Sequence, residues 1–225
     1  MTNTENPTAM ILGATGLIGN HLLRLLLASP VFGRVIAPSR RKIELAHSKL
    51  WNPVTGLDAL AEVWTGNTHV DVVFCCLGTT IKKAKTKEAF EQVDFAFPYE
   101  AAKLAKKYQV PHFAVVSAMG ADPESFFFYN RVKGKLESHL RELAFPNLTI
   151  VRPSLLIGDR GHESRIMESV SAIGLNLAGP LMMGGLANFK PVEAEKVALR
   201  LLKESECVLA RGRAVGVQII LSGEI

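Results

Sequence analysis

Residues 8–19 read Thr8-Ala9-Met10-Ile11-Leu12-Gly13-Ala14-Thr15-Gly16-Leu17-Ile18-Gly19, and this stretch decides the fold. Residues 8–12 predict a buried strand, and the leucine-rich residues 21–27 predict a helix. Between them, Gly13 permits a tight turn, Gly16 lets backbone amides approach a pyrophosphate, and Gly19 lets the helix pack closely on the sheet. Unpaired amides and the macrodipole at the start of the helix favour an anion there. The stretch therefore predicts a dinucleotide site that includes Gly13, Ala14, Thr15, Gly16, Leu17, Ile18 and Gly19.

Apolar runs and amphipathic segments alternate along the rest of the chain. Strands are predicted at residues 34–38, 70–77, 112–116, 148–152 and 215–221. Helices are predicted at residues 43–50, 86–108, 129–143 and 193–204. Pro98 is expected to kink the second of these helices. Because the apolar runs are continuous, they are typical of strands buried on both faces of a parallel sheet. We therefore predict an α/β fold of the Rossmann type, with a doubly wound, mainly parallel sheet and helices on both faces.

Length and composition predict one domain. The chain has 225 residues, of which 48% are hydrophobic, and this is enough for a single buried core. We therefore expect residues 1–225 to form a single NAD(P)-binding Rossmann domain. Within it, residues 154–190 are predicted to be an insertion that covers the substrate, because residues 174–188 are apolar and rich in glycine and methionine.

Several classes of partner are excluded by the same observations. The formal net charge is only +5, and no basic stripe interleaves with aromatic residues, so no nucleic-acid partner is expected. The histidines and cysteines have no metal-ligand spacing, so no metal is expected. No apolar run is long enough to span a membrane, and residues 1–7 do not have the order of a signal peptide. We therefore expect a cytoplasmic protein without a membrane partner that acts on a small molecule, and a homo-oligomer stays open.

The end of the second predicted strand indicates which dinucleotide binds. An NAD site usually has Asp or Glu here for the ribose 2′-hydroxyl, whereas an NADP site has Arg nearby. In this chain Ser39, Arg40 and Arg41 follow the strand, and the first carboxylate is Glu44. Two guanidinium groups suit a 2′-phosphate through charge-assisted bonds. The expected cofactor is therefore NADP(H), with Ser39, Arg40 and Arg41 in its site.

Three polar residues are candidates for catalysis. Tyr129 and Lys133 are four residues apart, so they share one face of a predicted helix. An ammonium near a phenol lowers the pKa of the phenol, and this prepares Tyr129 to exchange a proton with a substrate oxygen while a hydride is transferred. Ser117 ends the preceding strand, where its hydroxyl can orient a carbonyl group. We predict Ser117, Tyr129 and Lys133 as the catalytic set, and Lys133 can also hydrogen-bond the ribose hydroxyls of the cofactor.

Taken in order, five stretches resemble the short-chain dehydrogenase/reductase superfamily. They are Gly13-Ala14-Thr15-Gly16-Leu17-Ile18-Gly19, Cys75-Cys76-Leu77-Gly78-Thr79-Thr80, Ser117-Ala118-Met119-Gly120-Ala121-Asp122, Tyr129-Asn130-Arg131-Val132-Lys133-Gly134 and Asp159-Arg160-Gly161-His162-Glu163-Ser164-Arg165. The second and last stretches make the sequence similar to the atypical branch that contains the Tat-interacting-protein-type oxidoreductases. The resemblance covers nearly the whole chain.

This resemblance implies a Rossmann fold, NADPH binding, and catalytic positions for Ser117, Tyr129 and Lys133. It also implies the residues that contact the rest of the cofactor: Leu77, Gly78, Thr79, Pro153 and Leu155. Two features depart from the family pattern. Asp94 stands where many members have a helical asparagine that relays protons. Residues 50–53 replace a strand that normally ends in an acidic residue contacting adenine, which leaves the adenine contacts open.

These observations predict an NADPH-dependent oxidoreductase that reduces a small carbonyl substrate. Two other functions stay open. The protein can be an NADPH-binding regulator with little turnover, since the branch includes members better known for regulating other proteins. It can also be a sugar-nucleotide epimerase or dehydratase that uses the same three residues, but the stretch after Pro153 is short for a lobe that binds a nucleotide sugar.

Overall fold

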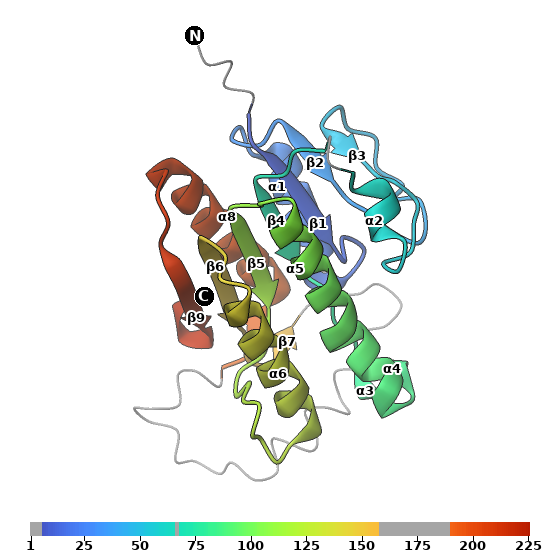
Figure 1. Cartoon of the computed structure of the whole chain (residues 1–225), viewed down its shortest axis with the longest axis vertical. Coiled ribbons are helices and arrows are strands. Elements are labelled where there is room, and N and C mark those ends of the chain that lie inside the picture. Colours follow the sequence, from blue (N-terminus) through green and yellow to red (C-terminus); the bar gives the residue numbers. More distant parts are fainter. Residues whose placement is uncertain (1–5, 66–67, 158–189) are drawn as a thin grey trace.

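The computed structural model describes residues 6–65, 68–157 and 190–225. At its centre is a seven-stranded sheet in the order β3-β2-β1-β4-β5-β6-β9 (Figure 1). All neighbouring strands of this sheet pair in parallel. The strands are β1 (Thr8–Leu12), β2 (Arg34–Ile36), β3 (Leu50–Trp51), β4 (Val72–Cys75), β5 (His112–Val116), β6 (Asn147–Arg152) and β9 (Gly216–Leu221).

Helices cover both faces of the sheet (Figure 1). One face packs against α1 (Leu17–Ala28) and α8 (Ala194–Arg211), and the other packs against α5 (Phe97–Lys107) and α6 (Phe128–Glu142). The predicted doubly wound Rossmann architecture is therefore confirmed.

The positions of its side chains explain why β1 is apolar from Ala9 to Leu12. Ala9 and Ile11 belong to the core beneath α1 and α8. Met10 and Leu12 belong to the core beneath α5 and α6. Successive side chains on a strand point to opposite faces, so a strand covered on both sides needs an apolar residue at every position.

The strand order reverses between β1 and β4. The chain first moves outward through β2 and β3, and then returns to pair β4 on the other side of β1. In open α/β sheets, ligands bind outside the carboxyl ends of the strands at such a switch point. Four turns begin at this edge, because Gly13, Cys76, Ser117 and Pro153 directly follow β1, β4, β5 and β6.

The predicted helix at residues 43–50 is wrong. The structure has a loop there, and its last residue belongs to β3. The side-chain oxygen of Asn52 accepts a hydrogen bond of 2.8 Å from the amide of Ile43. The amide of Leu45 bonds only two residues back, to the carbonyl of Ile43. A tertiary hydrogen bond and a tight turn therefore take the place of the helical ladder.

The predicted helix at residues 86–108 is divided into three parts. These are α4 (Lys87–Glu91), a π-helical turn η1 (Gln92–Ala96) and α5. Pro98 has no amide hydrogen to donate to the carbonyl of Asp94, four residues earlier. The amide of Phe97 instead bonds to the carbonyl of Gln92, five residues earlier. The missing amide of Pro98 thus coincides with a wider turn, and Asp94 is buried within that turn.

Five short elements complete the described residues: α2 (Leu60–Val63), α3 (Ile81–Ala84), β7 (Leu156–Ile157), β8 (Val192–Glu193) and η5 (Ser222–Glu224). β7 pairs in parallel with β8, which joins the two ends of the predicted insertion at residues 154–190. Most of that insertion, including residues 174–188, lies outside the described residues. Within the part of the chain that the structure describes, no helix is long and apolar enough to cross a membrane.

Candidate functional site

The backbone geometry of the turn after β1 requires glycine at two positions. Gly13 has a φ of +83°, and a Cβ there would lie 2.8 Å from the carbonyl oxygen of Cys76. A Cβ on Gly19 would overlap the carbonyl group of Gly13. Since both obstacles are backbone atoms, neither position has room for a side chain.

Gly16 has no comparable structural reason to be glycine. Its φ of −77° and ψ of 174° suit any residue. A Cβ there would approach the carbonyl oxygen of Gly13 at 3.2 Å, which needs a shift of only a few tenths of an ångström. Its missing side chain leaves open the space in front of α1. That helix starts with neither a side-chain cap nor an acidic residue in its first turn. A dinucleotide pyrophosphate fits such a helix start.

The turn after β2 presents two unpaired guanidinium groups. Arg40 and Arg41 are exposed, and neither makes an ion pair within the described ranges. The turn is held by Asn52, whose side-chain amide donates to the hydroxyl of Ser39 at 2.8 Å and to the carbonyl of Ala37. Asn52 therefore orders the segment that carries both arginines.

The helix α6 brings Tyr129 and Lys133 together beside a carboxylate. The Nζ atom of Lys133 lies 2.8 Å from Oδ1 of Asp94, which η1 contributes. The Lys133 and Asp94 side chains are only 4% and 1% exposed. Tyr129 is 37% exposed, and its ring packs on Phe90 of α4, with centroids 5.7 Å apart. The phenol thus stands between a buried ion pair and the surface.

The expected lowering of the Tyr129 pKa is wrong. Burial of the phenol raises its pKa, and Asp94 adds to that effect, whereas Lys133 acts in the opposite direction. Burial alone would lower the pKa of Lys133, but Asp94 and then Tyr129 outweigh it, so the Lys133 pKa is raised. Lys133 is therefore a buried cation, and the negative charge of Asp94 offsets most of its positive charge.

The turn after β4 contacts the same ion pair. The amide of Thr79 donates to Oδ2 of Asp94 at 2.8 Å. A Cβ on Gly78 would lie 3.4 Å from Oδ1 of Asp94 and 3.8 Å from Nζ of Lys133. Gly78 is thus adjacent to the lysine, and Thr79 is bonded to the partner of the lysine, Asp94. Pro153 and Leu155 follow β6 at the same edge, where their carbonyls accept from the amides of Met119 and Val192.

Ser117 is tied to another part of α6. Its hydroxyl donates to Oε1 of Glu137 at 2.6 Å. Arg152 holds both oxygens of the same carboxylate, at 2.9 and 2.6 Å. Glu137 is 2% exposed, and it lies one helical turn after Lys133. The structure therefore brings Tyr129 and Lys133 together with Asp94, whereas the single hydroxyl hydrogen of Ser117 is used by Glu137.

Two acidic residues, Glu137 and Asp94, bind predicted catalytic residues, and the sequence did not predict either contact. Glu137 continues the four-residue spacing of Tyr129 and Lys133 along one face of α6, and this spacing was a signal that could have identified it. The sequence marks Asp94 only as a departure from the asparagine of many family members. Asp94 is buried within a π-helical turn, and a sequence pattern does not reveal such a turn.

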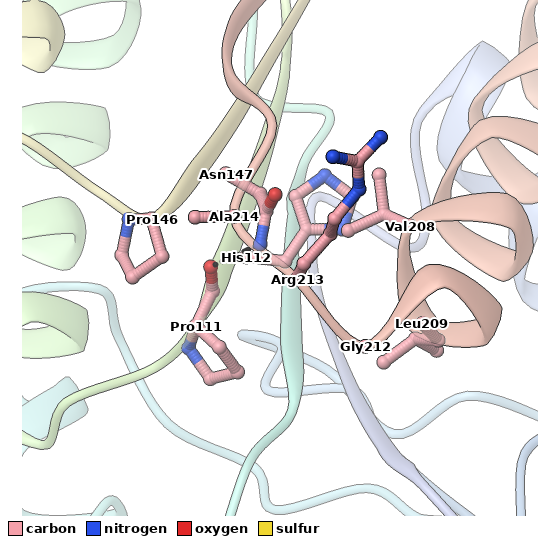
Figure 2. A pocket seen from close by; sticks show the side chains of 9 residues that line it. All are labelled: Pro111, His112, Pro146, Asn147, Val208, Leu209, Gly212, Arg213 and Ala214. Carbon is pink, nitrogen blue, oxygen red and sulfur yellow. Dashed lines mark hydrogen bonds between the residues drawn. The ribbon is translucent and has the colours of Figure 1, made fainter.

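A cavity of about 320 Å³ lies at the opposite edge of the sheet, where β5, β6 and β9 begin (Figure 2). It is lined by His112, Asn147 and Arg213, among others, and by none of the predicted site residues. His112 is fully buried, and its Nε2 atom is 3.0 Å from the hydroxyl oxygen of Thr149. Burial lowers the pKa of His112 from 6.5 to about 4.

His112 should make the protein less stable in mild acid. Below pH 6.5 the unfolded chain binds a proton that the folded chain does not bind until about pH 4, so the free energy of unfolding falls as the pH drops through this window. At pH 5 the loss is about 2 kcal/mol relative to pH 7. Urea unfolding at both pH values measures it. In His112→Gln this loss should disappear, and an equal loss in both proteins would contradict the assignment.

Comparisons with known proteins agree with this fold. A family model described as NAD(P)H-binding matches residues 13–175. "Protein HTATIP2" of Rattus norvegicus is 38% identical over 164 residues, which cover 72% of this chain and 67% of that protein. "Protein FMP52, mitochondrial" of Candida albicans is 31% identical over 203 residues, or 84% of each chain. A solved oxidoreductase of the short-chain dehydrogenase/reductase family from Burkholderia thailandensis superimposes with a TM-score of 0.69 at 18% identity, covering 98% of this chain and 93% of that one.

These names overturn one expectation. The polar N-terminal residues predicted a cytoplasmic location, yet the FMP52 relatives of several yeasts carry the word mitochondrial in their names. The prediction of a cytoplasmic location is therefore wrong. It rested on the missing order of a secretory signal, and a secretory signal is only one of the signals that direct a protein.

Proposed function

The chain belongs to the NAD(P)H-binding family whose model matches residues 13–175, and on that premise we propose that it reduces small carbonyl compounds with NADPH. The observation that carries this proposal is the position of Lys133. Its buried ammonium is paired with Asp94, is adjacent to the turn at Gly78, and acts electrostatically on the phenol of Tyr129. An acid that can donate a proton thus stands next to the place where Rossmann folds bind their cofactor.

The residues at this edge fit a phosphorylated dinucleotide. The turn at residues 13–19 and the uncapped start of α1 would receive the pyrophosphate. Arg40 and Arg41 would hold the 2′-phosphate, because both are exposed and have no carboxylate partner in the described part of the chain. Leu77, Gly78, Thr79, Pro153 and Leu155 would line the remainder. Bound NADPH supplies the hydride.

Side chains of the protein carry out the proton transfer. Tyr129 donates its hydroxyl proton to the carbonyl oxygen of the substrate, which becomes the alcohol oxygen. Lys133 stabilises the phenolate that this leaves, since its ammonium is fixed by Asp94 and cannot turn away. Ser117 would orient the substrate oxygen only after its hydroxyl leaves Glu137.

The hydrogen bond from Ser117 to Glu137 favours a second candidate function, that of an NADPH-binding regulator with little turnover. In that case the hydrogen bond between Ser117 and Glu137 is permanent. Of the two predicted hydroxyl groups, only that of Tyr129 then remains available to a substrate. The two functions are separated by an assay in which a panel of small aldehydes, ketones and quinones is added to protein and NADPH. Loss of NADPH absorbance with one of them supports the reductase. Tight NADPH binding without loss of absorbance on any of them supports the regulator.

The cofactor preference should depend on the two arginines. Arg40→Ala combined with Arg41→Ala should weaken NADPH binding by roughly 30- to 1000-fold, the worth of about 2–4 kcal/mol of charge-assisted phosphate bonds. NADH binding should hardly change, because NADH lacks the 2′-phosphate. Calorimetry measures both affinities.

A matched control keeps the change in net charge equal. Arg211 and Arg213 lie near the opposite edge of the sheet, and both are exposed. Arg211→Ala combined with Arg213→Ala removes the same two charges and should leave both affinities unchanged. Equal affinity of the unmodified protein for NADPH and NADH would refute the proposed preference.

A further inference from the structure

We propose that Asp94 is a positioning residue, which holds the Lys133 ammonium in a buried ion pair and thereby helps the Tyr129 hydroxyl to keep its proton. The inference rests on the proposed function for its meaning, because a reductase needs Tyr129 with its proton. Its physical content concerns only the charges around Tyr129, so it can be tested without a substrate.

Asp94 is fixed in place by contacts on both of its oxygens. Oδ1 faces the ammonium of Lys133 at 2.8 Å, and Oδ2 accepts from the amide of Thr79 at 2.8 Å. The side chain is 1% exposed. Asp94 lies in the π-helical turn η1, and Pro98 of α5, which has no amide hydrogen, is four residues later. Both carboxylate oxygens of Asp94 are therefore held in fixed positions beside the lysine.

The described elements around Tyr129 contribute few other charges. α6 contributes Lys133, and η1 contributes Asp94. From α4 come the uncharged ring of Phe90 and the ammonium of Lys87, which lies over the ring of Phe128 at 5.4 Å. Cys75 of β4 faces the ion pair, and burial raises the pKa of its thiol to about 11, so the thiol is neutral near pH 7. The charges nearest to the phenol are therefore one cation and one anion in contact.

This pairing changes what Lys133 does. A free ammonium beside a phenol would favour phenolate, but Asp94 offsets the charge of this ammonium. In the reduction, the O–H bond of Tyr129 breaks, and its proton forms the new O–H bond of the alcohol while hydride reaches the carbonyl carbon. The phenolate then takes a proton from water. With Asp94 present, this proton is restored across the neutral range, so the rate of reduction should not depend on pH there.

The test is a titration of Tyr129 in the full-length protein. The chain has three tyrosines, so ¹³C-labelling of the phenolic carbon gives three resonances, and Tyr129→Phe identifies the relevant one. In Asp94→Asn the cation loses its partner, and the midpoint of Tyr129 should fall by at least about one pH unit. In Lys133→Met the anion is left alone, and the midpoint should rise.

Two further variants complete the experiment. Asp71→Asn is the matched control, because Asp71 also accepts from a backbone amide, that of Thr8, but lies just before β4 at the other edge of the sheet. Its midpoint for Tyr129 should equal that of the unmodified protein. If Asp94→Asn does not fold, Asp94→Asn combined with Lys133→Met leaves no unpaired buried charge, and its midpoint should stay within about half a unit of the unmodified protein.

The outcomes decide the proposal without reference to turnover. An unchanged or higher midpoint in folded Asp94→Asn would overturn it, as would a rise of more than one unit in the double variant. Where turnover is found, the alkaline limb of kcat/KM for reduction should move to lower pH in Asp94→Asn by the same shift as the titration. If the unmodified protein turns over no substrate, the proposed function fails, and the titration still decides the role of Asp94.

Discussion

Tyr129→Phe should reduce the rate of carbonyl reduction by about 10²–10⁴, the usual worth of a positioned acid–base group. NADPH affinity should stay within a few-fold, because the change removes one oxygen and keeps the ring that packs on Phe90. Tyr129 as a whole residue is 37% exposed, and its hydroxyl makes no hydrogen bond within the described ranges, so the free energy of unfolding should hardly change. Steady-state assays, calorimetry and urea unfolding measure the three quantities.

A second tyrosine provides the control for this variant. Tyr99 of α5 stacks on Phe95, with ring centroids 5.9 Å apart, and it lies outside the candidate site. Tyr99→Phe should leave the rate of reduction unchanged. A Tyr129→Phe protein that keeps most of its activity would show that another group donates the proton, and the assignment of Tyr129 would have to be abandoned.

Gly16→Val should abolish NADPH binding while the protein stays folded. The expected loss is at least about 100-fold in dissociation constant, or close to 3 kcal/mol, because the branched side chain fills the space in front of α1. The backbone at Gly16 suits any residue, and a Cβ there meets only the carbonyl oxygens of Gly13 and Cys76, at 3.2 and 3.9 Å. The cost in stability should be about 1 kcal/mol, as for a valine at a helix N-cap.

A substitution at Gly19 serves as the comparison for Gly16→Val, because it should affect stability as well as binding. A Cβ at Gly19 overlaps the Gly13 carbonyl, so Gly19→Ala should lower the free energy of unfolding as well as the affinity for NADPH. Calorimetry and urea unfolding of both variants separate the two effects. Normal NADPH affinity in folded Gly16→Val would mean that the pyrophosphate does not bind in front of α1.

Much of the fold followed from patterns that are local in sequence. β1, β4 and β5 are apolar at nearly every position, because α1 and α8 cover one face of the sheet and α5 and α6 cover the other. Such runs predict a parallel sheet without any knowledge of the partners. The helix at residues 43–50 was predicted wrongly, because the bond that replaces it comes from Asn52 outside that window.

For the candidate site, the sequence by itself determined which residues gather at one edge. Gly13, Ser117 and Pro153 each follow a strand, and parallel strands end at the same edge. The four-residue spacing likewise placed Tyr129 and Lys133 on one helix face.

Only the tertiary structure decided the charges that these groups meet. Lys133 is paired with Asp94, and Ser117 donates to Glu137. These contacts join α6 to η1 and to the end of β5, over distances in sequence that no periodicity spans. The pKa of a group depends on its burial and on the charges nearest to it in space. For that reason the sequence could name Tyr129, but its protonation state followed only from the packed structure.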